Sequence, residues 1–199
     1  MSPLVPDGVA LAEDFLTAWF CVQAMMVDSI CELTGVRVSD FEPDTRLMAA
    51  VGRSVSAVEL LKCEARWHEH NRALARYHTE YDLWLSPTLS APPPTLGSMD
   101  TPWALDLFSG MVSRMGLAGQ LRHSQAFQST VLNNLAWTPY TQMANLTGRP
   151  AMSVPLHWTP EDLPLGVQFV GPLNGEALLL QLAAQLEQAR PWAQRRPPL

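Results

Sequence analysis

Apolar side chains recur at steps of three or four residues along the first part of the chain. The members of this series are Leu11, Phe15, Trp19, Val22, Met26, Ile30 and Leu33. Steps of this size place side chains on one face of an α-helix. The pattern therefore predicts a long helix over residues 9–33 that buries this stripe, and Gly35 is the residue expected to end it.

Two more helices are predicted before residue 80. The first covers residues 43–51, because Pro43 suits the first turn of a helix and Gly52 follows the last turn. The second begins at Ser56, which together with Glu59 forms the pattern of a capping box. These helices account for the first eighty residues of the chain.

The pattern changes in the middle of the chain. Residues 83–85 form a short apolar run that predicts a strand, and residues 86–102 are too rich in proline for regular structure. A helix is predicted over residues 103–115, where a Thr-Pro pair precedes an apolar series. Residues 117–137 show no periodicity that favours one element.

The last third of the chain has clearer elements. Residues 139–147 predict a short helix that ends at a glycine, and two apolar runs, residues 151–156 and 165–171, predict strands joined by a loop. A final helix covers residues 176–189 and carries leucines on one face. We therefore predict an α/β fold in which N-terminal helices are followed by a small mixed sheet packed with helices.

Composition adds a hint about partners. Apolar residues make up 47% of the 199 residues and charged residues only 16%, whereas an ordinary soluble domain has about 25% charged residues. So few charges predict that part of the surface is covered by another chain or segment. The net charge of −6 argues against a nucleic-acid partner, which selects for basic surfaces.

The cysteines and the apolar runs predict a cytoplasmic location. Cys21, Cys31 and Cys63 stand far apart, as is typical of reduced thiols in a cytoplasmic protein. No apolar run approaches the roughly 18–20 residues that span a membrane, and the first residues lack the features of a signal peptide. We therefore expect no membrane partner.

Two groups of reactive side chains are explained without a metal-binding or catalytic role. His68 and His70 are two residues apart, so on a helix they point about 200° apart and do not share a metal ion. We therefore predict no metal site. Cys21 lies in the first helix, where a free cysteine is usually a small buried side chain. Independent hydrolysis through Cys21 or a histidine is the least favoured of the functions considered.

The segment from residue 138 to residue 171 carries the most specific motifs. The motif residues are Thr141, Ala144-Asn145, Gly148-Arg149-Pro150-Ala151 and Leu163-Pro164-Leu165-Gly166-Val167-Gln168. In this order they resemble the C-terminal region of the amidase signature family. Upstream segments extend the likeness over about residues 8–199, and they are Phe41-Glu42-Pro43, Gly52-Arg53, Tyr81-Asp82, Ser86-Pro87-Thr88 and Pro92-Pro93-Pro94. The likeness is greatest to the branch that includes 6-aminohexanoate-cyclic-dimer hydrolases.

The resemblance implies an amide hydrolase whose catalytic region is missing from this sequence. The family hydrolyses amides with a nucleophilic Ser, a bridging Ser and a Lys that accepts the proton. This sequence has no Gly-Gly or Ser-Ser dipeptide, and its single lysine, Lys62, lies in the middle of a predicted helix. We therefore assign no catalytic residue and no cofactor, and expect residues 1–199 to form one incomplete, truncated amidase-like domain, with a helical part over 8–80 and a strand-and-helix part over 81–199.

By the same resemblance, the chain contributes fold and part of the wall of a substrate pocket. The candidate substrate-binding residues are Trp19, Cys21, Thr88 and Asn145. The expected partners are an N-terminal amidase half or a second copy of the chain, and a small-molecule amide in the complete enzyme. The alternative is a non-catalytic oligomeric scaffold, or a small-molecule binding protein, derived from an amidase.

Overall fold

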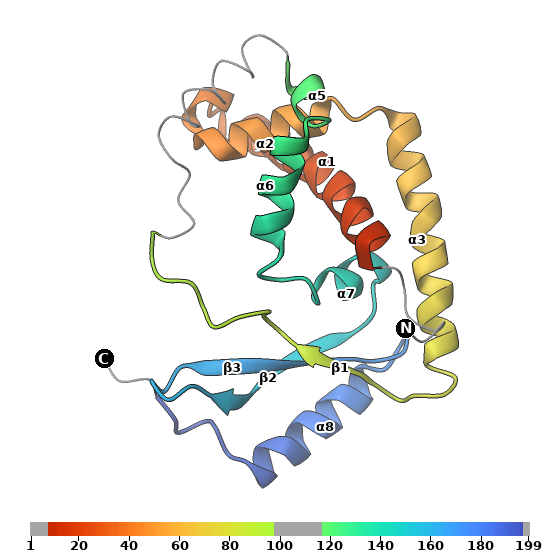
Figure 1. The fold of residues 1–199 in the computed structure, drawn as a ribbon, viewed down its shortest axis with the longest axis vertical. Helices are drawn as coiled ribbons and strands as arrows, with labels where there is room; N and C mark the ends of the chain where they lie inside the picture. The colour runs from red at the N-terminus through yellow and green to blue at the C-terminus, as the bar shows by residue number, and fades with distance from the viewer. Residues whose placement is uncertain (1–7, 98–116, 197–199) are drawn as a thin grey trace. The chain divides into compact units, whose positions relative to one another are not determined.

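The computed structural model describes residues 8–97 and 117–196 (Figure 1). The predicted helix over residues 103–115 lies outside the described residues. The elements are, in chain order, α1 (Gly8–Thr34), the 3-10 helix η1 (Val38–Asp40), α2 (Pro43–Arg53), α3 (Ala57–Tyr77), β1 (Trp84–Pro87), α5 (Ala118–Leu121), α6 (Gln125–Leu135), α7 (Gln142–Thr147), β2 (Ala151–Trp158), β3 (Pro164–Val170) and α8 (Glu176–Ala189).

The chain divides into two compact units. One unit, here called the sheet unit, consists of Met1–Leu11, Trp67–Pro93 and Ala136–Leu199. The other, here called the helix unit, consists of Ala12–Arg66 and Pro94–Leu135. The sheet unit contains all three described strands with α7 and α8, whereas the described elements of the helix unit are helical. The α/β class predicted from the sequence is confirmed.

The sheet has the strand order β1-β3-β2, and both pairings are antiparallel. The sequence predicts a mixed sheet, but in the described residues no parallel pair is present. The short connection between β2 and β3 explains the second pairing, because a parallel crossover needs a dozen or more residues. A β-bulge between Val154 and His157 interrupts β2.

One face of the sheet is covered by α8 (Figure 1). The core between them is formed by Val154, Phe169 and Leu179, which are 6%, 8% and 4% exposed. Alternation along the strands explains this core, because every second residue of a strand projects to the same side. The remaining strand residues therefore project to the face opposite α8.

The helix boundaries in the helix unit follow from local capping. Gly35 has a φ of +75°, and its N–H donates to the carbonyl of Cys31 at 2.9 Å, so it ends α1 as predicted. At the start of α3, the Ser56 N–H donates to Glu59 Oε2 at 2.9 Å and the Glu59 N–H donates to Ser56 Oγ at 3.2 Å. The predicted capping box is therefore present.

The predicted buried stripe of α1 is wrong in its second half. Val22, Met26 and Leu33 are 43%, 48% and 84% exposed. The side that is buried carries Phe20, Ala24 and Val27.

The close approach of α2 explains this choice. A Cβ at Gly52 would lie 1.9 Å from the carbonyl oxygen of Phe20. Only glycine therefore permits this contact, and it fixes which side of α1 faces α2. The spacing of apolar residues alone does not distinguish the two sides, because both are apolar.

Residues 117–137, which the pattern leaves open, contain the short helix α5 and the longer α6. The first is only four residues long and the second carries polar residues on most of its surface, so neither produces a clear period.

By length and composition, α1 meets the requirements of a membrane span, with a mean hydropathy of 1.3 over 18 residues. The sequence reading missed this because polar residues interrupt the apolar series. A core helix passes the same test, so the finding is weak evidence for a membrane.

Candidate functional site

A row of polar side chains crosses the face of the sheet opposite α8. Ser86 of β1 and Ser153 of β2 are both paired with Gln168 of β3. Directly paired residues of antiparallel strands project to the same side. Thr88 follows β1 two residues after Ser86 and continues the same side. These four residues are here called the hydroxyl row.

Two hydroxyls of the row bond to each other across β3. The Thr88 and Ser153 hydroxyl oxygens are 2.6 Å apart, and the Thr88 N–H donates to the carbonyl of Gly166 at 3.0 Å. A Cβ at Gly166 would lie 2.4 Å from Ser153 Oγ and 2.6 Å from Thr88 Oγ1. Glycine at position 166 therefore leaves the space through which the two side chains meet.

Gln168 holds the centre of the row. It is 4% exposed, and its Nε2 donates to Ser86 Oγ at 3.3 Å and to the carbonyl of Tyr140 at 3.0 Å. Because a buried amide is costly unless it is hydrogen-bonded, these contacts fix both the side chain and the segment that leads into α7. The row is rigid at Gln168 and accessible at Ser153, which is exposed.

The chemistry of the Thr88–Ser153 pair suits an amide. Two hydroxyls carry two O–H donors and four lone pairs between them, and their mutual bond uses one donor and one lone pair. One O–H therefore remains to donate to a carbonyl oxygen, and lone pairs remain to accept from an N–H. Among the described residues, no histidine, lysine or carboxylate is hydrogen-bonded to either hydroxyl, so the arrangement binds and orients rather than attacks.

The first of the predicted site residues, Trp19, lies in the helix unit. It packs against a core cluster that includes Phe20, Val51 and Val131, and its ring centroid is 5.5 Å from that of Phe20. This contact gives Trp19 a packing role. Cys21 is two residues further along α1, so it projects from a different side of the helix.

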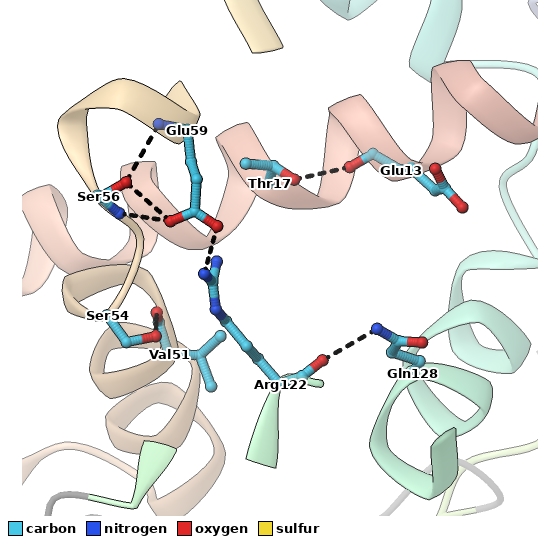
Figure 2. A network of polar contacts seen from close by, with 8 residues as sticks. All are labelled: Glu13, Thr17, Val51, Ser54, Ser56, Glu59, Arg122 and Gln128. Carbon is cyan, nitrogen blue, oxygen red and sulfur yellow. Dashed lines mark hydrogen bonds and ion pairs between the residues drawn. The ribbon is translucent and has the colours of Figure 1, made fainter. Parts of the chain in front are cut away.

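Cys21 lies near an ion pair that joins α3 to the residue after α5. Arg122 Nη2 donates to Glu59 Oε1 at 2.5 Å, and Figure 2 shows this contact beside the capping box of Ser56. Burial raises the pKa of the Cys21 thiol, and the charge of Arg122 only partly opposes this effect. A thiol with a raised pKa is a poor nucleophile near neutral pH, which argues against hydrolysis through Cys21.

The capping box and the same ion pair together lower the pKa of Glu59. The pKa of Glu59 falls from 4.5 to about 2 because the Ser56 backbone N–H donates to its carboxylate, with further contributions from Arg122 and the Ser56 hydroxyl. Glu59 is therefore charged at neutral pH.

The other two predicted site residues lie in the sheet unit. Thr88 is in the hydroxyl row, whereas Asn145 is an exposed residue of α7 whose backbone N–H donates to Thr141 at 3.3 Å. The Thr88 hydroxyl is hydrogen-bonded to Ser153, so within the described part of the chain Thr88 and Asn145 share no hydrogen-bond partner. Trp19 and Cys21 thus belong to the helix unit and Thr88 and Asn145 to the sheet unit, and the substrate-binding role of all four stays a prediction.

The sequence reading missed Ser86 and Ser153. Both alternate with apolar neighbours that face α8, but only the pairing of the strands places them beside Thr88 and Gln168. Lys62 lies within α3, as predicted, and is exposed there. In the described ranges no group of three or more His, Cys, Asp or Glu side chains is placed to hold a metal ion.

Comparison with known proteins agrees with the motifs. A family model described as Amidase matches residues 33–180. Lipoamidase of Enterococcus faecalis is 31% identical over 152 residues, which are 75% of this chain and 20% of that protein. The 6-aminohexanoate-cyclic-dimer hydrolase of Pseudomonas sp. strain NK87 is 30% identical over 199 residues, with 94% of this chain and 35% of that protein covered.

Solved structures show the same fold. A 6-aminohexanoate cyclic dimer hydrolase complexed with substrate matches with a TM-score of 0.76 and 24% identity, over 97% of this chain and 38% of that chain. A bacterial aryl acylamidase of the amidase signature family matches with a TM-score of 0.62 and 15% identity, over 97% and 37%. The chain thus spans only 20% to 38% of the length of these relatives.

Proposed function

This chain belongs to the amidase family, and we propose that it is the C-terminal segment of an amide-bond hydrolase. In this proposal the chain contributes fold and one wall of the substrate pocket. The nucleophilic Ser, the bridging Ser and the Lys are supplied by an amidase segment other than residues 1–199, on the same polypeptide or on a separate one.

The single observation that carries the proposal is the unequal coverage of the structural match. Nearly the whole chain, 97%, superimposes on 38% of the cyclic dimer hydrolase. In addition, the only lysine of the sequence, Lys62, is exposed on a helix. A general base of the family type needs a desolvated lysine, because burial lowers the pKa and leaves the amine neutral.

The hydroxyl row is the part of the chain best suited to the pocket wall. Thr88 and Ser153 present hydroxyls on a rigid sheet, and an amide substrate has one carbonyl acceptor and, when secondary, one N–H donor. A wall built on strands positions such groups more precisely than a loop does. The proposed substrate is therefore a small-molecule amide oriented by these hydroxyls.

The proposed location is the cytoplasm. Three free cysteines support it, since Cys21, Cys31 and Cys63 form no disulfide. In this proposal α1 packs within the folded protein rather than in a membrane, because Phe20, Ala24 and Val27 on one of its sides are buried in core clusters.

The test combines a chemical probe with a chimeric enzyme. The chain alone is treated with a fluorophosphonate serine probe, weighed by intact mass spectrometry and assayed on linear and cyclic amides. We expect no adduct and no turnover. A chimera in which this chain replaces the matched part of the Pseudomonas hydrolase is expected to label and to turn over.

Two results would overturn the proposal. A stoichiometric adduct with turnover by the chain alone means that it carries its own nucleophile. A folded chimera that neither labels nor turns over favours the scaffold or binding protein instead. As a matched control, Ser153→Ala in the chimera is expected to raise KM while leaving probe labelling intact.

A further inference from the structure

Arg149 is a buried arginine without an acidic partner among the described residues. It follows α7 and is 6% exposed. Its Nη2 donates one hydrogen bond, to the backbone carbonyl of Asn71 at 3.3 Å, and its Nε–H is buried without a partner. Burial lowers the pKa of the guanidinium, and no carboxylate of the described residues offsets this effect.

This environment is costly for the chain by itself. An arginine keeps its proton inside a protein, so Arg149 is a buried cation. A buried charge is strongly unfavourable unless a partner of opposite charge and further hydrogen bonds compensate it. The planar fork of a guanidinium matches the two oxygens of a carboxylate. The missing partner is therefore best supplied by a carboxylate.

A second buried donor lies close by along α3. The indole Nε1–H of Trp67 is buried without a partner, and Trp67 is one turn before Asn71. The two residues are linked, because Asn71 Nδ2 donates to the Trp67 carbonyl at 3.3 Å. Both unpaired groups are donors, so both call for an acceptor such as a carboxylate oxygen.

The position of Arg149 indicates what brings that carboxylate. Arg149 lies two residues before β2, and within the described residues β2 is hydrogen-bonded on one side only, to β3. Pro155 has no N–H, which leaves the first half of β2, beside Arg149, as the uninterrupted part of this edge. An open edge is a template for another strand, and a segment added there passes next to Arg149.

We propose that Arg149 anchors an Asp or Glu side chain of the amidase segment that carries the catalytic Ser and Lys residues. The ion pair forms when that segment adds beside β2. This inference rests on the proposed function, because it names the contact through which the proposed partner is held.

The experiment compares three forms of the chain. They are the wild type, Arg149→Met, which replaces the cation by an apolar side chain of similar length, and Arg72→Met, which removes an exposed arginine of α3 as the matched control. Urea unfolding of each is followed in chloride and in acetate of equal ionic strength. Binding of the part of the Pseudomonas hydrolase outside the matched region is measured in parallel.

The sign of the effect separates this proposal from a structural role. Alone in chloride, Arg149→Met is expected to unfold at a midpoint no lower than Arg72→Met, because it removes an unpaired buried charge. Acetate is expected to raise the midpoint of the wild type but not of Arg149→Met. Binding of the hydrolase segment is expected to weaken at least tenfold in Arg149→Met only.

Three results would overturn the proposal. If Arg149→Met is less stable than the control in chloride, Arg149 already stabilises the fold of this chain. If acetate protects the wild type but Arg149→Met binds the hydrolase segment normally, the site binds only a small carboxylate. The third result is that neither measurement distinguishes Arg149→Met from the wild type. A segment that does not bind the wild-type chain counts instead against the proposed function, and the acetate series still reports on Arg149.

Discussion

The two units of this protein treat buried charge differently. In the helix unit, the carboxylate of Asp14 is 1% exposed and is bonded by Arg66, whose Nε donates to it at 2.8 Å. Glu59 and Arg122 form a second pair in the same unit. In the sheet unit, Arg149 is also buried, at 6% exposed, but within the described part of the chain its hydrogen bond goes to a backbone carbonyl and not to a carboxylate.

The difference lies in the ionic partner. In the helix unit the buried carboxylate of Asp14 and the largely buried guanidinium of Arg122 each have a partner of opposite charge, although Arg122 Nε is itself buried without a hydrogen bond. The sheet unit holds an uncompensated cation and an accessible pair of hydroxyls on one open sheet. Such features are typical of a surface that another polypeptide segment covers, and they support placing the proposed partner at the sheet.

The largest expected effect comes from breaking the ion pair between the half-exposed Arg66 and the buried Asp14 in the helix unit. Arg66→Met removes two charge-assisted hydrogen bonds, from Nε and Nη2, to the buried carboxylate of Asp14, and we expect a loss of about 3 kcal/mol in the free energy of unfolding. Urea unfolding measures it, with Arg72→Met as the control for losing one exposed arginine. An Arg66→Met chain as stable as that control would remove the contrast between the units.

An intermediate effect is expected at Gly166 in the sheet unit. Gly166→Ala brings a Cβ against the hydroxyls of Thr88 and Ser153, and we expect a loss of about 2 kcal/mol from overpacking. Gly171→Ala is the control, because its Cβ would meet no atom closer than 3.5 Å. Thermal unfolding measures both. Adding Ser153→Ala to Gly166→Ala is expected to recover part of the loss, and no recovery would mean that the hydroxyl pair does not set this requirement.

The smallest effect is the pH dependence contributed by Glu59. Its folded-state pKa of about 2 lies below the ordinary 4.5, so its contribution to stability is complete above about pH 4.5 and is lost as the pH falls through about 2. Glu59→Gln is therefore expected to lose less stability than the wild type over that interval. Denaturation midpoints at a series of pH values measure it, with Glu64→Gln as the control. Parallel curves for Glu59→Gln and the wild type would contradict the assignment.

Much of the secondary structure was predictable because its signals are local. Gly35 ends α1 through a bond to a residue four positions earlier, and Ser56 and Glu59 begin α3 within one turn. The order of motifs around Gly148 and Gly166 likewise identifies the family without any structure. By contrast, residues 117–137 carried no prediction, because short polar helices have no strong period.

The functional surface was predictable only in part. Thr88 was singled out by resemblance, but its partner Ser153 is 65 residues away along the chain and is found only through strand pairing. Asn145 is an exposed residue of α7 and Trp19 packs against a core cluster, so their local contacts do not test a role in substrate binding. Their substrate contacts stay predictions.

The sequence by itself determined the helix ends, the α/β class and the amidase family, because each depends on neighbours in the chain or on motif order. The tertiary structure alone decided which side of α1 is buried, which hydroxyls meet across β3 and that Arg149 has no acidic partner among residues 8–97 and 117–196. The physical reason is the same in each case. Burial and strand register depend on residues that are distant in sequence, such as Gly52 against Phe20, and no local pattern encodes their approach.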